Sequence, residues 1–217
     1  MVSARISNGR ELPIGKILCI GRNYVDHIRE LGNETPSAPV VFMKPASSVV
    51  ADGGEVIIPA YSANCHHEAE LALLVGERGK NIPEEKALAF IAGYGVAIDL
   101  TLRDVQDELK KKGLPWEIAK GFDTACPLST FTPAEQVADP QQLTITMRVN
   151  GEERQKGSTA LMINPTARLI SHLSTIFTLE PGDIILTGTP AGVSRIVPGD
   201  TLEAEIERVA TLRVSVR

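Results

Sequence analysis

The sequence predicts an α+β fold in which β-strands outnumber helices. Two observations favour this class: many short apolar segments are separated by turn residues, and only a few stretches have helical periodicity. The 217 residues are enough for one domain with a sizeable core. A hydrophobic fraction of 43% and a charged fraction of 23% are ordinary for a globular protein.

Four segments have the pattern of a helix: 23–31, 81–93, 101–113 and 164–177. Asn81 and Pro83 begin the second of them, which is expected to end at Gly93. Thr101 and Asp104 resemble a capping box at the start of the third. The fourth follows Asn164-Pro165 and is expected to bury an apolar face formed by Leu169, Ile170, Leu173, Ile176 and Phe177.

Strands are expected where apolar residues form a continuous run or alternate with polar ones. The continuous runs, which predict strands buried on both faces, are 17–20, 71–75, 93–98 and 183–187. The alternating segments, which predict strands with one exposed face, are 143–149, 201–207 and 210–216. Asn150-Gly151 follows the first alternating segment and predicts a tight hairpin turn.

Charge and hydropathy exclude several classes of protein. Lys and Arg number 22 against 27 Asp and Glu, and the one dense basic run, Lys110-Lys111-Lys112, ends a predicted helix, where cations suit the helix dipole. We therefore expect no nucleic-acid-binding surface. No apolar run is long enough to span a membrane, and residues 1–15 lack the apolar core of a signal peptide, so a cytoplasmic protein is expected. Cys19, Cys65 and Cys126 form no Cys-x-x-Cys pair and indicate neither a disulfide framework nor a thiolate zinc site.

Glu68 and Glu70 are the most informative residues in the chain because they open a buried strand. On a strand, side chains at i and i+2 point to the same face, so these two carboxylates are neighbours. The apolar run 71–75 predicts burial, and two buried carboxylates repel each other and lose their hydration. A bound cation is the simplest compensation.

Most Glu-x-Glu pairs on strands belong to a solvated face instead. The segment 201–207 is an example, because Glu203, Glu205 and Glu207 alternate with apolar residues and should face water. The pair at 68 and 70 differs because a continuous apolar run follows it.

A third carboxylate, Asp99, ends the apolar run 93–98. Three carboxylates at the ends of buried strands predict a site for a hard cation, either Mg²⁺ or Mn²⁺. Three protein ligands would leave coordination positions for water or substrate, which is typical of a catalytic metal. Zinc is an alternative, because His66 would share a strand face with Glu68 and Glu70.

Two further features contain residue types that act in catalysis. His27 and Glu30 are three residues apart, which makes them neighbours on a helix, and a carboxylate beside a histidine orients the ring for activating water. A surface ion pair is the alternative for these two residues. Lys120 follows an apolar turn and would stabilise an enolate or a carboxylate, unless it is only a surface charge.

Taken together, these segments resemble the fumarylacetoacetate hydrolase family, in blocks that follow the family's order from about residue 16 to 207. The blocks are Gly21-Arg22-Asn23-Tyr24 with His27 and Glu30, Phe42-Met43-Lys44-Pro45, His67-Glu68-Ala69-Glu70-Leu71, Asp99, Arg103-Asp104-Val105-Gln106, Lys111-Lys112-Gly113-Leu114-Pro115-Trp116 with Lys120, and Gly182-Asp183 to Thr187-Gly188-Thr189-Pro190. The chain is most similar to the short members, the acylpyruvases and oxaloacetate decarboxylases.

The resemblance implies a rolled mixed β-sandwich with few helices, formed by a catalytic domain at 16–217 that follows an N-terminal arm at 1–15, and usually a homodimer. It implies that Mg²⁺ or Mn²⁺ is bound by Glu68, Glu70 and Asp99. It also implies that the catalytic residues are His27 and Glu30, on a segment that orders when substrate binds, together with Lys120. The residues that it implies for holding the substrate are Arg103, Gln106 and Thr189.

The expected function is therefore hydrolysis of acylpyruvates of the acetylpyruvate or fumarylpyruvate type to pyruvate and a carboxylic acid, with oxaloacetate decarboxylation. Both reactions pass through pyruvate enolate, which a metal chelated by the 2-oxo acid would stabilise. The alternative is an isomerase or decarboxylase of the 2-hydroxyhepta-2,4-diene-1,7-dioate type, from aromatic-compound degradation. A third hypothesis is a binding module without catalytic activity. A turnover assay with Mg²⁺ distinguishes it from the two enzyme hypotheses.

Overall fold

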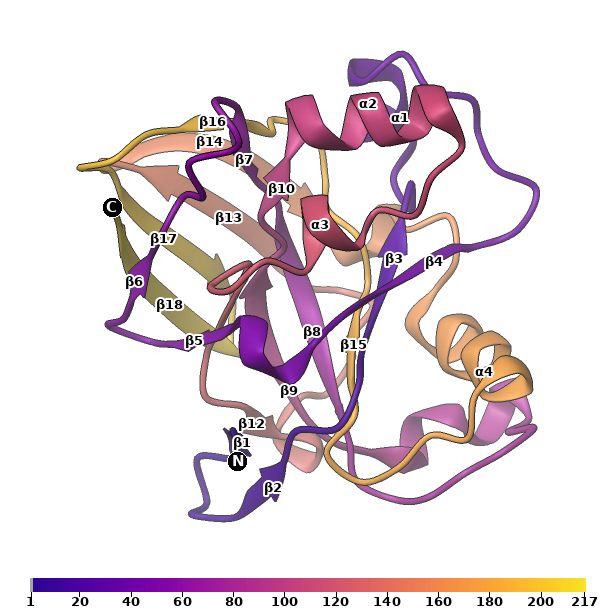
Figure 1. Cartoon of the computed structure of the whole chain (residues 1–217). Helices are drawn as coiled ribbons and strands as arrows, with labels where there is room; N and C mark the ends of the chain where they lie inside the picture. Colours follow the sequence, from indigo (N-terminus) through magenta and orange to yellow (C-terminus); the bar gives the residue numbers. More distant parts are fainter. Residues whose placement is uncertain (1) are drawn as a thin grey trace.

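Strands dominate the computed structural model, which describes residues 2–217, and the helices lie at its periphery (Figure 1). The strands of the largest sheet are β3 (Ile17–Gly21), β4 (Val40–Lys44), β5 (Val49–Ala51), β8 (Ala69–Val75), β9 (Ile91–Ile98), β11 (Cys126–Leu128), β12 (Thr132–Pro133) and β15 (Ile184–Leu186). They follow the order β4-β3-β15-β8-β9-β11-β5, and β12 pairs with β9 beside this path.

A second sheet of five strands packs against the first one. Its strands are β6 (Glu55–Val56), β13 (Thr144–Val149), β14 (Glu152–Ser158), β17 (Thr201–Ile206) and β18 (Ala210–Val216), in the order β14-β13-β17-β18-β6. Both β17 and β18 contact β9, and β13 contacts β8. A three-stranded sheet is formed by β7 (Cys65–His67), β10 (Thr101–Leu102) and β16 (Ser194–Ile196), and β1 (Ser3–Arg5) pairs with β2 (Glu11–Pro13).

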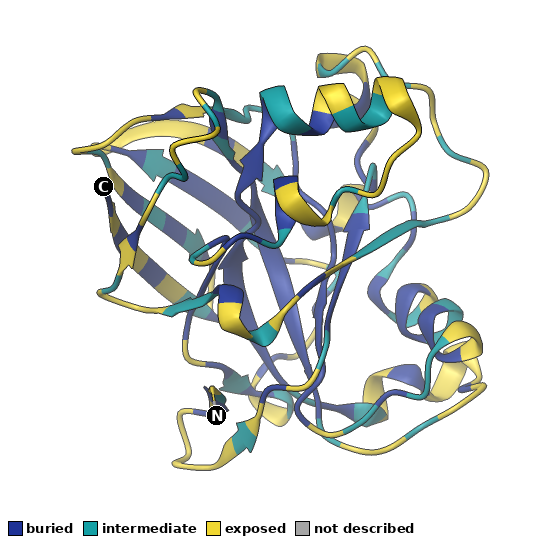
Figure 2. Ribbon diagram, viewed as in Figure 1, coloured by how far each residue is buried: buried dark blue, intermediate teal, exposed yellow. Residues whose placement is uncertain are grey.

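The architecture is a curled, mixed β half-barrel with few helices, which confirms the predicted fold class. The large sheet is mixed because β15 runs parallel to β3 but antiparallel to β8, and β11 runs parallel to β5. The central strands β8, β9 and β15 are buried (Figure 2), and every residue of β8 is buried, as the continuous apolar run predicts.

The predicted hairpin is present between β13 and β14. Its two turn residues, Asn150 and Gly151, have φ angles of 53° and 81°, the left-handed conformation that a tight hairpin turn requires. In β17, Glu203 and Glu205 are half-buried rather than fully solvated, because both carboxylates pair with Arg148, at 3.2 and 3.3 Å. Glu207 is exposed, as the alternating pattern predicts.

The α-helices are α1 (Val25–Glu30), α2 (Arg103–Lys112), α3 (Glu117–Lys120) and α4 (Thr166–Ile176). The short 3₁₀ helices are η1 (Ala46–Ser48), η2 (Glu84–Phe90), η3 (Ala134–Gln136) and η4 (Thr159–Leu161). The helix predicted at 81–93 is therefore wrong in type and in its end. Gly93 lies in β9, where a β-carbon would come within 2.8 Å of the Thr132 carbonyl oxygen, so this glycine permits strand packing rather than ending a helix.

Two smaller helix predictions are also wrong. Thr101 does not cap α2, because its hydroxyl donates to the Asp99 carbonyl oxygen at 3.4 Å, and Asp104 instead accepts hydrogen bonds from Ser62 Oγ and Ala63 N, at 2.6 and 2.8 Å. Asp104 keeps one local bond, from the Val105 amide at 2.9 Å, but the reciprocal capping box with Thr101 is absent. On α4, Ile176 is exposed rather than buried, because the helix ends there.

No helix among residues 2–217 combines the length and the apolar composition needed to cross a membrane.

Candidate active site

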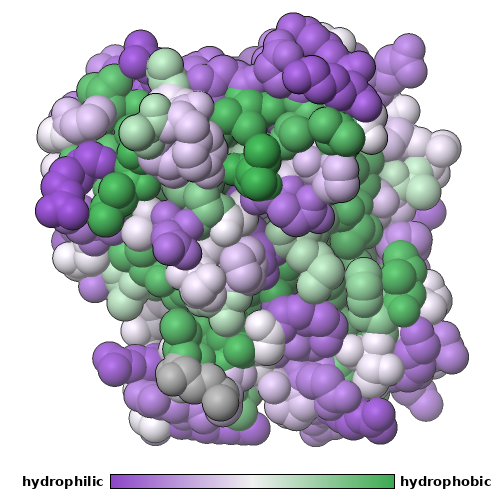
Figure 3. All heavy atoms as spheres, in the orientation of Figure 1, coloured by the Kyte–Doolittle hydropathy of each residue, from purple (hydrophilic) through white to green (hydrophobic). Residues whose placement is uncertain are grey.

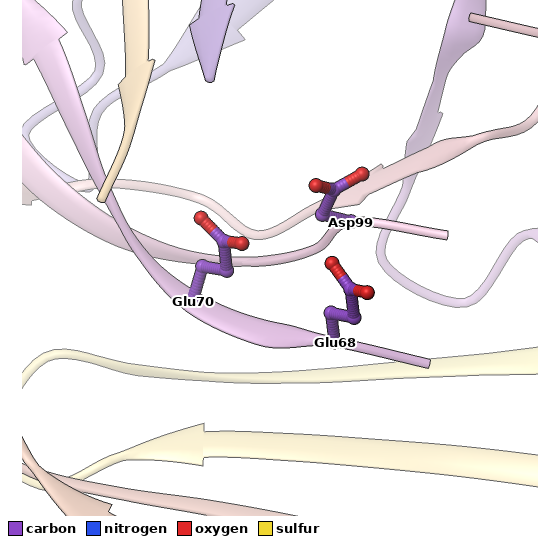
Figure 4. A group of neighbouring side chains, drawn as sticks. All are labelled: Glu68, Glu70 and Asp99. Atoms are coloured by element: carbon purple, nitrogen blue, oxygen red, sulfur yellow. The ribbon is translucent and has the colours of Figure 1, made fainter. Parts of the chain in front are cut away.

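The three predicted carboxylates meet at one end of the paired strands β8 and β9. The antiparallel register sets Ala69 opposite Ile98, so Glu68 and Asp99 lie side by side, and Asp99 N donates to Glu68 O at 2.8 Å. Glu70, two residues along the strand, points to the same side. In Figure 4 the carboxylates of Glu68, Glu70 and Asp99 face one another, and one oxygen from each lies within 4.8 Å of the others.

Two basic side chains bind directly to this carboxylate cluster. Lys120, at the end of α3, places Nζ 2.9 Å from Glu68 Oε2 and 2.7 Å from Asp99 Oδ2. Arg103, at the start of α2, donates through Nη2 to Glu68 Oε1. Burial by itself opposes the charge of Glu68, but Lys120 and Arg103 hold the pKa of that carboxyl well below its usual range.

Lys44 is a third buried cation, to which the sequence analysis assigned no role. Its ammonium donates to three main-chain carbonyls, those of Leu100 at 3.2 Å, Ala125 at 3.0 Å and Lys120. It also lies 2.8 Å from Asp99 Oδ1. The available signal was a lysine at the end of the otherwise apolar segment 40–44, directly before Pro45.

Replacement of Lys44 by methionine is expected to cost about 3–5 kcal/mol in free energy of unfolding, because Asp99 and three buried carbonyls would lose their partner. Urea denaturation of the two proteins measures this difference. Arg78→Met is the matched control, since its 2.9 Å pair with Glu180 is exposed and should be worth less than about 1 kcal/mol. Equal losses in the two variants would contradict a special role for Lys44.

The donor set and its electrostatics fit a hard divalent cation. Glu70 has no ion-pair partner within residues 2–217, and it accepts only the Gly188 amide, at 2.7 Å. Burial, together with the charges of Asp99 and Glu68, raises the pKa of Glu70 well above its usual range. Asp99 Oδ1 receives no aligned hydrogen bond, because the three donors of Lys44 are taken by carbonyls. A cation between these oxygens would satisfy both groups.

His66, the ligand of the alternative zinc site, does not belong to this group. The metal-binding arrangement found in the described chain comprises the three carboxylates alone. His66 Nε2 contacts Asn64 Oδ1 at 3.0 Å instead. Burial and the nearby Arg103 lower the pKa of His66 to about 4, so the ring is neutral.

His27 and Glu30 approach each other on α1, with 3.4 Å between Nδ1 and Oε2. Glu30 also accepts the Gly192 amide, at 3.0 Å, which fastens the end of α1 to the loop after β15. His27 is buried and lines the same small cavity as Glu68. His27 therefore faces the carboxylate cluster, whereas Glu30 is exposed to solvent on the other side of the ring.

The residues predicted to hold substrate lie beside the cluster. Gln106 Oε1 accepts from Arg103 Nη1 at 2.8 Å, which fixes the guanidinium against Glu68. The Thr189 hydroxyl donates to the Ala69 carbonyl, between the two glutamates, at 2.8 Å. All the predicted site residues are thus brought together around one end of the large sheet.

Gln155 supports this arrangement from β14, and the sequence analysis did not identify it. Its amide oxygen accepts from Ala69 N at 3.1 Å and contacts His67 Nδ1 at 3.0 Å. Its amide nitrogen donates to Thr189 Oγ1 and Pro190 O, both at 2.8 Å. Gln155 therefore holds the strand of the metal-ligand candidates and the loop after β15 in a fixed relation.

The cavity at the cluster is small, about 30 Å³. Its wall is formed by residues of β3, β4, α1, α2 and α3 and the segments beside them, and includes Glu68, Arg103, Gln106 and Lys120. A larger cavity, about 590 Å³, is an open groove beside β1 and β5, and none of the three carboxylates lines it. A cavity of 30 Å³ holds about one water molecule, so a larger molecule can enter only if part of its wall moves.

The sequence matches a known protein family along most of its length. Residues 16–217 match the family model described as fumarylacetoacetate (FAA) hydrolase C-terminal. Oxaloacetate tautomerase YcgM of Escherichia coli (strain K12) is 49% identical over 193 residues, which are 88% of each protein. The mitochondrial oxaloacetate tautomerase FAHD1 of Mus musculus is 49% identical over 201 residues, 93% of this chain and 91% of that protein.

Solved structures give the same result. The fumarylpyruvate hydrolase of Pseudomonas aeruginosa, crystallised with Mn²⁺ and pyruvate, has a TM-score of 0.95 at 38% identity and covers 99% of this chain and 95% of its own. The 2-hydroxyhepta-2,4-diene-1,7-dioate isomerase of Mycobacterium marinum has a TM-score of 0.83 at 35% identity, covering 96% of this chain and 81% of its own. The fold, the carboxylate cluster and these similarities agree: the chain belongs to the fumarylacetoacetate hydrolase family.

Proposed function

We propose that this protein is a divalent-metal-dependent enzyme that interconverts the keto and enol forms of oxaloacetate. The observation that carries the proposal is the buried cluster of Glu68, Glu70 and Asp99 with Lys120 bound across two of its members. The names of the two tautomerases that are 49% identical to this chain support the same reaction.

Glu68, Glu70 and Asp99 would hold Mg²⁺ or Mn²⁺, for which an all-carboxylate oxygen set is suited. When bound, the cation would withdraw electrons from the 2-oxo group of a substrate and so favour its enol form. The charges of the site support an anionic substrate. Three carboxylates are balanced by Lys44, Arg103 and Lys120, so a divalent cation adds two positive charges that a dicarboxylate would neutralise.

Each of the neighbouring residues has a role in this proposal. Arg103, which Gln106 orients, would bind a carboxylate of the substrate, and Thr189 would bind the same end from the loop after β15. The Lys120 ammonium would stabilise the negative charge that develops on the substrate oxygen as the enol forms. Asp99 and Glu68 raise the pKa of Lys120, despite its burial, so the ammonium stays charged.

Tautomerisation also needs a group that moves a proton between C3 and the 2-oxo oxygen. His27 is the candidate, because it lines the cavity and Glu30 occupies the side of its Nδ1. Its Nε2 is then directed away from Glu30 and is available to the substrate. Glu30 would orient the ring, as the sequence analysis proposes.

A second candidate function is hydrolysis of acylpyruvates, with oxaloacetate decarboxylation. The His27–Glu30 pair favours it, as does the similarity to the Pseudomonas aeruginosa fumarylpyruvate hydrolase. Water activated by His27 would add to the distal carbonyl, and the C–C bond to C3 would break, giving a carboxylic acid and pyruvate enolate. In oxaloacetate, loss of CO₂ from C3 gives the same enolate without water. The isomerase alternative shares this enol chemistry.

The test is a panel of reactions with the purified protein and Mg²⁺: tautomerisation of oxaloacetate, its decarboxylation, and hydrolysis of acetylpyruvate and fumarylpyruvate. We expect tautomerisation to have the highest kcat/KM. Hydrolysis faster than tautomerisation would favour the second candidate, and no activity at all would contradict both. We also propose a homodimer, as the family resemblance implies, and sedimentation equilibrium at several protein concentrations tests it.

The variant Lys120→Met keeps most of the side-chain volume and removes the charge. It is expected to lower kcat for every reaction of the panel by about 10²–10³-fold, because each one develops negative charge on the same oxygen. Lys80→Met is the control, since Lys80 is exposed and donates only to the Thr175 carbonyl. A selective loss of one reaction would contradict the shared role of Lys120.

A further inference from the structure

The cavity beside the carboxylate cluster carries an excess of positive charge. Four basic side chains line it, those of Arg22, Arg103, Lys110 and Lys120, whereas Glu68 is its one acidic lining residue. Hydrophilic side chains cover the top of the molecule in Figure 3, where α1 and α2 lie in Figure 1.

Two of these cations are neutralised and two are not. Arg103 and Lys120 pair with Glu68, as described above. Arg22 donates through Nη2 to the neutral Asn33 Oδ1 at 3.0 Å, and no carboxylate of the described residues lies within 4.0 Å of it. Lys110 has only a long contact of 3.9 Å with Asp107.

The ammonium of Lys110 is electrostatically crowded. Burial and the charge of Arg103 lower its pKa, Asp107 opposes the shift, and the charges of Arg22 and Lys120 add to it. Like charges held together raise the free energy of a site until an anion binds between them. A second observation also indicates a ligand in this cavity. Arg103 lines it, and the buried Arg103 Nε–H has no hydrogen-bond partner.

An aromatic wall formed by Phe42 and Trp116 lies between Lys110 and Lys120. Lys120 Nζ lies 4.8 Å from the centroid of the Phe42 ring, and Phe42 lies 5.9 Å from Trp116, centroid to centroid. Lys110 Nζ lies 5.6 Å from the Trp116 centroid at the other end. The cavity thus has a cationic group at each end of an apolar wall, which suits a molecule with an anionic group at each end of a carbon chain.

We infer that Arg22 and Lys110 form a distal anion subsite that binds the second carboxylate of a 2-oxo dicarboxylic acid. The inference rests on the proposed function, in which the 2-oxo end of the substrate lies at Glu68, Glu70 and Asp99. It adds a basis for selectivity: dicarboxylic substrates bind at both ends of the cavity, whereas monocarboxylic ones bind at one. His27 and Leu31 also line the cavity, so α1 closes over the ligand between the two ends.

The test measures binding by calorimetry in the presence of Mg²⁺, with three ligands that differ in the distal group. Oxalate has only the head, 2-oxopentanoate has a methyl tail, and 2-oxoglutarate has a carboxylate tail of the same length. A charge-assisted hydrogen bond should make the wild-type protein bind 2-oxoglutarate ~10–100-fold more tightly than 2-oxopentanoate.

In Lys110→Met and in Arg22→Gln, this ratio should fall about tenfold or more, while oxalate affinity stays within about twofold of wild type. Lys111→Met is the matched control, because Lys111 is the next residue of the same helix end and pairs with Glu108 at 3.2 Å on the exposed side. It removes the same charge and should leave the ratio unchanged.

Each outcome decides a separate question. A ratio that is unchanged in both variants, or that falls equally in Lys111→Met, would overturn the subsite while leaving the proposed function intact. Failure of the wild-type protein to bind even oxalate with Mg²⁺ would instead overturn the proposed function. Thermal unfolding of each variant without ligand shows whether the chain is folded, so a lost ratio in a folded variant is attributed to the subsite.

Discussion

Replacement of Glu70 by alanine is expected to abolish turnover of 2-oxo acids and to leave the chain folded. Glu70 is the one carboxylate of the cluster that no cation of the described chain neutralises, so it depends most on the metal. A Lewis-acid metal supplies several kcal/mol of stabilisation, so its loss should lower kcat/KM by ~10³-fold or more. The core should persist, because β8 remains buried between its neighbours.

The same variant makes a second expectation possible without any assay of activity. Without metal, Glu70→Ala removes a buried carboxyl that is costly to ionise but leaves the Gly188 amide without its acceptor, so the two effects offset and the free energy of unfolding should change little. With Mg²⁺, the wild-type protein should gain stability and the variant should not. Glu205→Ala is the control, because Glu205 lies in β17 and pairs with Arg148. Stabilisation of Glu70→Ala by Mg²⁺ equal to that of wild type would contradict the assignment.

Replacement of His27 by alanine should remove acylpyruvate hydrolysis by about 10²–10⁴-fold, the usual contribution of a general base. Decarboxylation of oxaloacetate needs no attacking water and should decrease less. The measurement is kcat for both reactions in one preparation. His172→Ala is the control, since His172 lies half-buried on α4, away from the cavity.

Equal losses of both activities in His27→Ala would mean that His27 closes or positions α1 rather than activating water. The contact of Glu30 with the Gly192 amide provides a way to separate these roles. Glu30→Gln keeps an acceptor for that amide but removes the carboxylate beside the ring. If orientation of His27 by a charged partner matters, this variant should also lose hydrolysis more than decarboxylation.

The carboxylate cluster could be predicted from the sequence because it depends mainly on residues that are close together along the chain. Glu68 and Glu70 share a strand face through the two-residue period, and the apolar run after them required burial. The pairing of Asp99 with Glu68 needed the register of β8 and β9, which the sequence does not state but the resemblance to a family implied. The fold class followed from the same patterns.

Residues that act across the fold could not be predicted in this way. Lys44 meets carbonyls of residues 100–125, and Gln155 contacts residues 67–69 and 189–190, so their roles depend on how remote segments pack. The capping box predicted for Thr101 and Asp104 is absent for the same reason, because a remote segment packs against Asp104. Asp104 accepts from the Val105 amide of its own helix and also from Ser62 and Ala63, which belong to a remote segment.

The choice between hydrolysis and tautomerisation is also beyond the sequence motifs. Both reactions use a metal, an opposing cation and a group near the substrate that moves a proton, and Glu70, Lys120 and His27 would supply these in either case. In the proposed mechanisms, the difference would lie in whether water reaches the distal carbonyl when the cavity is closed. That depends on the closed geometry of the cavity, which the positions of catalytic residues along the chain do not encode.

The most direct test of the central claim is a titration of metal-free protein with Mn²⁺, in which metal binding and oxaloacetate tautomerisation are measured together. The account predicts that one Mn²⁺ binds per chain and that activity rises in proportion to occupancy. In Glu70→Ala, both the binding and the activity should be lost, while Glu205→Ala should match wild type. Full activity in the metal-free protein, or strong Mn²⁺ binding that survives loss of Glu70, would contradict it.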